Sequence, residues 1–464
     1  MRHNSAKEVA RMDMLHGPLF KKMLTFALPL IASGVLQQSF NSIDIAVVGK
    51  FSSSQALAAV GSTGLVISLL INLFVGISIG ANVIIAHYIG QRNEKGIRNA
   101  ISTVAVIAVA SGLLLMAAGL TIARPILELI DTPHDVIDLA TLYLRIYFIG
   151  MPFMMIYNFG AAILRSMGDT KRPFYSLIIA GIVNTVLNLI LVISFDMSVA
   201  GVAIATVAAN IVNATIMIWY LVREQEPYRL NLRKLSVSRP DLRRILQIGV
   251  PAGIQGVVFS ISNVFILSTI NKFGSEAVAG SSAAINYEYY CYFVMSAFCQ
   301  AAVAFTSQNY GAGLIDRCKR IFRLSMTMSM LSCAALNILM VWQKELCASV
   351  FTSSPEVMEY AAIRLRYVLL FQWIACSYEI SGASLRGLGY SMTPTMFTIF
   401  GTCLFRLLWI YTVCPVYNSF EVLMYVYPIS WVITGVAVAG AYYVIRRKAF
   451  AIPTEQPTLQ TANQ

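Results

Sequence analysis

Apolar residues follow one another along this chain in long, nearly uninterrupted stretches, without the alternation that marks half-buried strands. As a helix, each stretch is long enough to cross the roughly 30 Å hydrocarbon core of a bilayer. Open strand edges cannot face lipid, so we predict an all-α membrane protein with twelve transmembrane helices. Their approximate limits are 22–48, 57–85, 99–122, 137–163, 174–195, 199–222, 246–271, 277–305, 321–343, 360–384, 395–415 and 421–445.

The composition agrees with this prediction. Hydrophobic residues make up 57% of the 464 residues and charged residues only 12%, against about 45–50% and 25% in soluble chains. The net charge of +12 comes from basic residues between the apolar stretches, so we expect no nucleic-acid partner. With the N-terminus in the cytoplasm, 26 Lys and Arg residues fall on the cytoplasmic side and 7 on the other. This bias predicts a multi-pass protein of the cell (inner) membrane with both termini cytoplasmic.

The two halves of the chain resemble each other at an offset of about 221 residues. Residues 157–173 and 378–394 share six identities in seventeen positions, among them Leu164-Arg165 with Leu385-Arg386. We therefore predict two six-helix bundles related by parallel duplication, which enclose a cleft that can open to either side of the membrane. The predicted segments are an N-terminal cytoplasmic tail (1–21), an N-lobe (22–222), a cytoplasmic linker (223–245), a C-lobe (246–448) and a disordered C-terminal tail (449–464).

Several polar residues lie inside the apolar stretches of the first half. A charged group at the centre of a span costs about 2.5–3.5 kcal/mol, so Asp44 is a functional candidate by default. Asn41 shares its helix face, Asn184 and Asn188 share another, and Thr206 lies in the sixth span. One carboxylate among amides and a hydroxyl can hold a proton or Na⁺. The alternative is a cluster of interhelical hydrogen bonds.

The second half has different charges. Ile266 stands where the repeat would place a second Asp44, while Glu288, Glu379 and Arg406 lie inside spans. We expect Glu379 to be the counter-ion of Arg406, in a structural pair or as part of transport. Tyr287 and its tyrosine neighbours around Glu288 form either an aromatic wall for organic cations or an interfacial belt.

No catalytic or nucleotide machinery is apparent in the sequence. The chain has no GxxxxGK[ST] motif, its eight cysteines form no CxxC pair, and its four histidines lie near span ends or outside spans. A membrane enzyme, a receptor and a metal or redox cofactor are therefore disfavoured. Transport would be passive or driven by an ion gradient, with H⁺ or Na⁺ in place of a cofactor.

Several segments together resemble the MATE (multidrug and toxic compound extrusion) transporters over about residues 15–448. They are Leu164-Arg-Ser-Met-Gly-Asp-Thr-Lys-Arg-Pro173, Asn184-Thr-Val-Leu-Asn188, Gly201-Val-Ala-Ile-Ala-Thr206, Ser307-Gln-Asn-Tyr-Gly-Ala312 and Asp44 after Pro29. The resemblance implies two six-helix lobes and cation-coupled efflux of amphiphilic, often cationic compounds. It places the N-lobe cation site on Asp44, Asn184, Asn188 and Thr206, where many relatives have an acid in place of Asn188. In the seventh span, where some relatives carry a carboxylate, this chain has Gln255 and Asn263.

We therefore predict a secondary-active multidrug antiporter that acts on small molecules in the bilayer, as a monomer. The alternative within transport is a lipid-linked oligosaccharide flippase of the same superfold. Such a flippase would require a more basic cavity, and Arg406 is the one deeply placed cation that the sequence offers.

Overall fold

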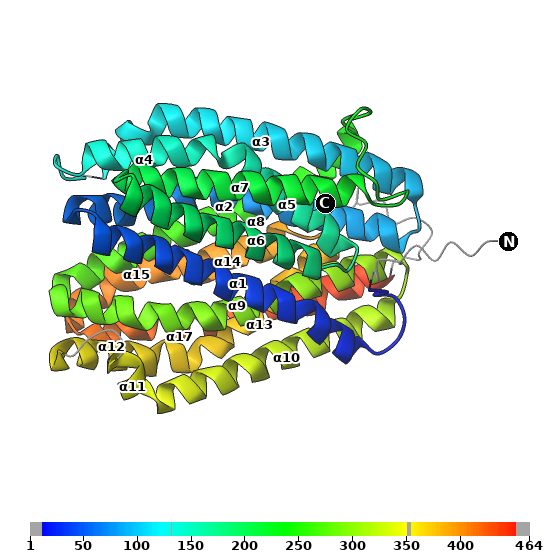
Figure 1. Cartoon of the computed structure of the whole chain (residues 1–464). Coiled ribbons are helices and arrows are strands. Elements are labelled where there is room, and N and C mark those ends of the chain that lie inside the picture. Colours follow the sequence, from blue (N-terminus) through cyan, green and yellow to red (C-terminus); the bar gives the residue numbers. More distant parts are fainter. Residues whose placement is uncertain (1–11, 131, 350–353, 452–464) are drawn as a thin grey trace.

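The computed structural model describes residues 12–130, 132–349 and 354–451, and within these ranges every regular element is a helix (Figure 1). The expected C-terminal tail at 449–464 lies mostly outside the described residues. The helices of the first half are α1 (Leu19–Phe51), α2 (Ser54–Gly90), α3 (Glu94–Leu129), α4 (Ile137–Ile149), α5 (Met151–Ser166), α6 (Lys171–Leu189), the π-helical η1 (Ile190–Ser194) and α7 (Ser198–Val222).

The second half repeats this order after the linker. Its helices are α8 (Arg239–Ile270), η2 (Asn271–Phe273), α9 (Ser275–Gly311), α10 (Ile315–Trp342), α11 (Lys344–Ser349), α12 (Pro355–Tyr367), η3 (Leu369–Ala375), α13 (Cys376–Gly387), α14 (Met392–Thr398), η4 (Ile399–Leu404), α15 (Phe405–Thr412), α16 (Cys414–Tyr417) and α17 (Phe420–Ala451).

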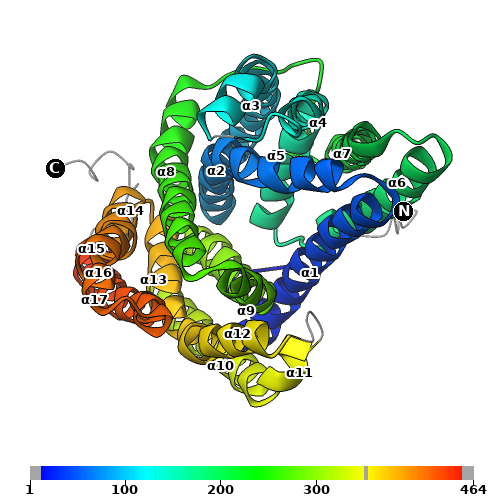
Figure 2. The ribbon, with the colours of Figure 1, turned by 90° about the vertical axis from the view of Figure 1, so that its left-hand side faces the viewer.

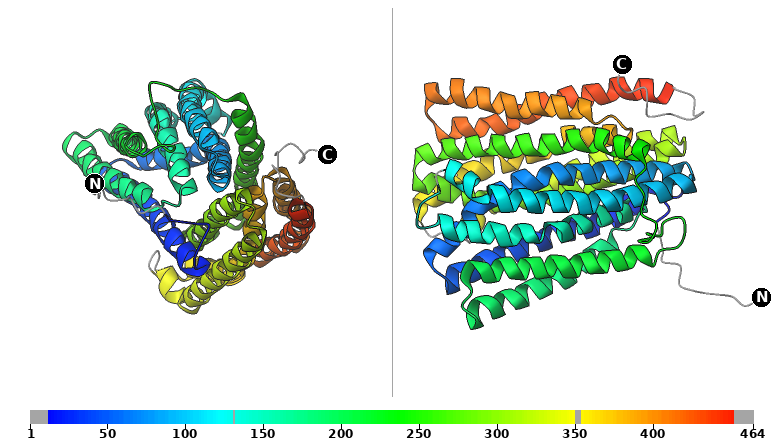
Figure 3. Two further views of the ribbon diagram at one scale, coloured as in Figure 1. Left: turned by 90° about the vertical axis from the view of Figure 1, so that its right-hand side faces the viewer. Right: turned by 90° about the horizontal axis from the view of Figure 1, so that it is seen from above.

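The predicted all-α membrane fold is confirmed. Ten helices in the described ranges are long and apolar enough to cross a membrane, and an eleventh span is the pair α4 and α5, bent by 48°. The stretch predicted at 360–384 is divided among α12, η3 and α13. Both described ends of the chain lie at the same end of the helix bundle (Figure 3). We call this the terminal end and the opposite one the distal end.

The apolar core divides into two clusters, one mainly from each half, and two helices contribute to both. Met23 and Phe26 of α1 pack in the cluster of the second half, whereas Val48 near the other end of α1 packs in that of the first half. Conversely, Ile245 of α8 packs with the first half and Ile270 of α8 with the second. Figure 2 shows α1 and α8 along the boundary between the two groups of helices. At the terminal end, the first helix of each lobe therefore packs in the core of the other lobe.

Glycines let the two lobes approach closely from mid-bundle to the terminal end. A Cβ added at Gly76 would lie 2.1 Å from the backbone nitrogen of Gly253, and one at Gly90 would lie 2.0 Å from the carbonyl oxygen of Gln308. In the distal part of α2, a Cβ at Gly61 would meet nothing within 4 Å. Small residues of this kind permit backbone contact between membrane helices. The lobes therefore touch at the terminal half of the bundle.

Candidate functional site

Four of the polar residues predicted in the first half meet between α1, α6 and α7. The Nδ2 of Asn188 donates a hydrogen bond of 2.5 Å to Oδ1 of Asp44. One turn earlier, the Nδ2 of Asn184 donates to Oγ1 of Thr206 over 3.4 Å. Asn188 is fully buried and Asp44 is half-buried. We call these four residues the acid site. The structure thus brings together Asp44, Asn184, Asn188 and Thr206 as the sequence indicated.

Two oxygens of the acid site have no donor. The Oδ1 atoms of Asn184 and Asn188 are buried and lack a hydrogen-bond partner within the described part of the chain. A buried polar group without a partner is costly unless an ion, a water or a ligand satisfies it. Together with the Asp44 carboxylate, these carbonyl oxygens form a set of hard oxygen donors. The site therefore has the chemistry to hold Na⁺ or a proton.

Two tyrosines beside the acid site were not identified from the sequence, and Asn41, which was expected in the site, is not part of it. Tyr143 and Tyr147 on α4 lie within electrostatic range of Asp44, with their rings stacked at 5.9 Å. Their spacing of four residues in a predicted span was the available signal. Asn41 is exposed on α1, and no contact with Asp44 is seen in the described ranges.

In the second lobe, Glu288 has a counter-ion that the sequence did not identify, Arg364. Nε and Nη2 of Arg364 donate to the two carboxylate oxygens of Glu288 over 2.6 and 3.0 Å. Nη2 also donates to the hydroxyl of Tyr427 over 3.3 Å. Arg364 is buried on α12, and Glu288 lies on α9. The carboxylate of Glu288 is thus neutralised from within the lobe.

The expected pair of Arg406 with Glu379 is wrong. The Nε of Arg406 donates to the hydroxyl of Ser430 over 3.3 Å, and its guanidinium lies 4.5 Å from the ring centre of Tyr427 and 5.3 Å from that of Phe259. A planar, weakly hydrated guanidinium can stack on aromatic faces in this way. In the described ranges Arg406 makes no ion pair.

Glu379 has a different basic neighbour. Its electrostatic partner is Arg386 on the same helix, α13, and Nη2 of Arg386 donates to Oε1 of Gln255 over 2.6 Å. Gln255 is thus part of a buried contact between α13 and α8. Asn263 is exposed on α8, and the described residues place no partner on it.

The tyrosines near Glu288 divide into two groups. Tyr287 is half-buried and packs against the small cluster around Cys291 and Leu365. Tyr289 and Tyr292 are exposed and lie beside Phe293, with ring centres 6.3 and 6.1 Å from it. The aromatic wall is therefore limited to exposed rings, and Tyr287 belongs to the packed interior.

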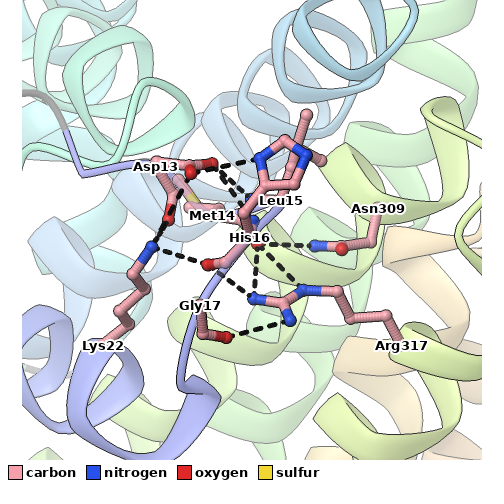
Figure 4. Close-up of polar contacts among 8 residues, drawn as sticks. All are labelled: Asp13, Met14, Leu15, His16, Gly17, Lys22, Asn309 and Arg317. Carbon is pink, nitrogen blue, oxygen red and sulfur yellow. Dashed lines mark hydrogen bonds and ion pairs between the residues drawn. The ribbon is translucent and has the colours of Figure 1, made fainter.

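The terminal end is closed by a segment that precedes α1 (Figure 4). The Nδ2 of Asn309 on α9 donates to the carbonyl of Met14 over 3.1 Å, and the guanidinium of Arg317 on α10 donates to the carbonyls of Met14, His16 and Gly17. The Met14 side chain is 1% exposed. Because these donors belong to the second lobe, the segment fixes the start of α1 to that lobe.

An acid of this segment is held in its charged form. Burial disfavours the Asp13 carboxylate, but hydrogen bonds from the backbone N–H groups of Leu15 and His16, together with the charge of Lys22, outweigh it and lower the pKa of Asp13. Lys22 also donates to the carbonyl of His16 over 2.6 Å. The turn before α1 is therefore stabilised from both its acid and its carbonyls.

Side chains close the terminal end between the lobes as well. The Nε2 of Gln308 donates to the carbonyl of Ser166 over 2.9 Å, and the Tyr88 hydroxyl donates to Asp241 over 2.6 Å. Both bonds join one lobe to the other, and Asp241 is buried.

The model of one protein family matches this chain twice, once in each half. The MatE family model matches residues 29–190 and again residues 251–412. The chain belongs to the MatE family. The two matches coincide with the two halves of the duplication, so the family model describes one lobe at a time.

This MatE protein has relatives and structural neighbours that cover most of its length. It is 29% identical to "Probable multidrug resistance protein YoeA" of Bacillus subtilis (strain 168), over 82% of this chain and 84% of the relative. It is 26% identical to "Probable multidrug resistance protein NorM" of Thermotoga maritima, over 82% of each. A solved structure of "MATE in complex with MaL6" superposes with a TM-score of 0.87 at 21% identity, over 94% of this chain and 98% of that one. The superposition confirms the fold.

Proposed function

We propose that this MatE protein is a secondary-active antiporter that exports amphiphilic organic compounds, cations among them, in exchange for H⁺ or Na⁺. The observation that carries the proposal is the acid site, where one carboxylate and two unpartnered amide oxygens meet inside a membrane bundle. Relatives named multidrug resistance proteins support the substrate class. A small-molecule exporter of this kind needs no cofactor, nucleic acid or second subunit.

The basic residues in the loops support an orientation of the protein in the membrane. Since 26 basic residues of the sequence fall on the predicted cytoplasmic side and 7 on the other, we infer that both termini lie in the cytoplasm of a cell whose inner membrane holds the protein. The lobes then touch on the cytoplasmic side, through Gly76, Gly90 and the segment before α1. This arrangement is the outward-facing state of an alternating-access cycle, and substrate uptake requires these contacts to separate.

The acid site supplies the coupling in this proposal. Asp44 accepts a hydrogen bond from Asn188 in the present state, and a bound proton or Na⁺ would neutralise its charge. Since Asp44 lies on α1, Asn188 on α6 and Thr206 on α7, ion binding changes the attraction between three helices of one lobe. A ligand shifts a conformational equilibrium only by its difference in affinity for the two states. The ion therefore drives the cycle if it binds with higher affinity to one of the two conformational states.

The test is the substitution Asp44→Asn in the full chain, reconstituted in vesicles that carry an imposed H⁺ or Na⁺ gradient. Gradient-driven movement of a fluorescent organic cation should be lost, because the amide cannot exchange a proton or balance a cation. Asp138→Asn is the matched control, since Asp138 is exposed on α4 and contacts Arg124 at the surface. Normal gradient-driven transport by Asp44→Asn would refute the coupling role and leave the proposed function without its main support.

A further inference from the structure

Two buried arginines of the second lobe approach the same tyrosine ring, and in the described ranges only one of them is paired with an acid. Arg364 and Arg406 approach the ring of Tyr427 with distances of 5.3 and 4.5 Å to its centre. Glu288 neutralises Arg364 through two hydrogen bonds. Arg406 is 1% exposed and makes no ion pair in the described ranges, where its Nη1 is buried without a hydrogen-bond partner. The cluster therefore carries one uncompensated positive charge.

A bare guanidinium in this position is costly. A buried charge is normally paired, and an arginine inside a membrane span marks a functional site by default. Ring stacking and one hydrogen bond to Ser430 satisfy only part of the Arg406 side chain. The group that completes it must accept hydrogen bonds, because guanidinium hydrogens are donors only. An anionic acceptor makes the stronger hydrogen bond and also balances the charge.

The helices around Arg406 form an enclosure. Phe259 comes from α8, Glu288 from α9, Arg364 from α12 and Tyr427 from α17, while Arg406 itself is on α15. Five helices of one lobe thus contribute to a single cluster. We call these five residues the arginine site.

The internal repeat relates part of the arginine site to the surroundings of the acid site. At an offset of 221 residues, Arg364 corresponds to Tyr143 and Tyr427 to Thr206. At the same offset, Arg406 corresponds to the residue that directly follows Asn184. The basic residues of the second lobe therefore stand where the first lobe has uncharged residues.

We infer that the arginine site binds the anionic group of a transported amphiphile, a carboxylate, sulfonate or phosphate, with Arg406 as the residue that selects it. The inference rests on the proposed function, because it names the substrate chemistry of one lobe. The acid site and the arginine site then serve ligands of opposite charge. A zwitterionic or anionic amphiphile is the substrate class that this geometry fits.

Equilibrium binding of a matched pair of probes tests the inference. The probes are 11-(dansylamino)undecanoic acid and its uncharged methyl ester, added to the full chain in phosphatidylcholine nanodiscs, with empty nanodiscs subtracted. Arg406→Gln should weaken binding of the acid by about 10- to 100-fold, the value of a hydrogen bond to a charged group, and change binding of the ester less than about 2-fold. Arg406→Lys should retain part of the preference for the acid. Arg366→Gln, an exposed arginine of α12, is the matched control.

A second variant covers the case in which Arg406→Gln fails to fold. Phe259→Glu places a carboxylate beside the guanidinium, so it should pair with Arg406 and compete with the acid probe while the ester still binds. Equal losses for acid and ester, or unchanged acid binding in both variants, would overturn the inference. Chloride is then added to both proteins. If chloride displaces the acid probe from the wild type but not from Arg406→Gln, an inorganic ion is the occupant of the arginine site, and the substrate assignment is overturned. No ion gradient is present, so the outcome is independent of the Asp44 experiment.

Discussion

Adding one methyl group at Gly90 should open the terminal end of the transporter. The Cβ of Gly90→Ala would lie 2.0 Å from the carbonyl oxygen of Gln308 and 2.9 Å from the backbone nitrogen of Ala312. Both obstacles are backbone atoms of α9 and its end, which cannot rotate away. Since non-bonded carbon contacts lie near 3.5 Å, the two helices must separate by roughly 1.5 Å. We expect a cost of about 1–3 kcal/mol for the closed state, the usual range for overpacking.

That cost shifts the population from closed to open by roughly 5- to 150-fold, if the open state does not include the contact. The assay is the distance between spin labels on Lys95→Cys and Arg320→Cys, two exposed positions at the terminal end of different lobes, in a chain without native cysteines. Gly90→Ala should move the distance distribution to longer values. Gly61→Ala on the same helix is the control, because its methyl meets nothing within 4 Å. An unchanged distribution for Gly90→Ala would show that the Gly90 contact does not hold the lobes together.

Two further predictions concern the interior of the second lobe and the orientation in the membrane. Removing the charge of either Glu288 or Arg364 should destabilise the protein by about 3–5 kcal/mol, because the other charge stays buried. The double substitution Glu288→Gln with Arg364→Met should cost less than either single change. Additive losses of stability, measured by thermal unfolding, would argue against the pair. A cysteine at Asn418 should react with an impermeant reagent added outside intact cells and one at Lys234 should not, and the reverse pattern would invert the proposed topology.

The fold could be predicted from the sequence because the bilayer restricts the choices. Long apolar stretches in a membrane can only be helices, and duplication fixes how the stretches are grouped. Several stretches that looked regular are not, and the one at 360–384 is broken at η3, where Leu369–Ala375 adopts a tighter helix. Apolar composition gave no warning of that break, since the hydropathy of a residue is the same in either helix type.

The acid site was predictable for a related reason. Asp44 is conspicuous in an apolar stretch, and its partners lie on helix faces that periodicity identifies. Pairing between charges was not predictable, because it depends on how the helices rotate about their axes. Arg364 lies nine residues inside α12 and reaches Glu288, while Glu379 lies near Arg386 of its own helix. Arg364 falls within the predicted span 360–384, but the sequence did not show that it faces Glu288.

Helix α1 connects the acid site with the contacts between the lobes at the terminal end. Asp44 lies seven residues from its distal end, whereas Met23 and Phe26 near its start are buried in the core of the second lobe. The segment before it is tied to the same lobe through Arg317. An ion that changes the attraction between Asp44 and Asn188 therefore acts on a helix whose other end is fixed to the opposite lobe. In the proposed cycle, coupling between the ion and the contacts at the terminal end then requires no relay through other elements, because both ends of the linkage belong to one continuous helix.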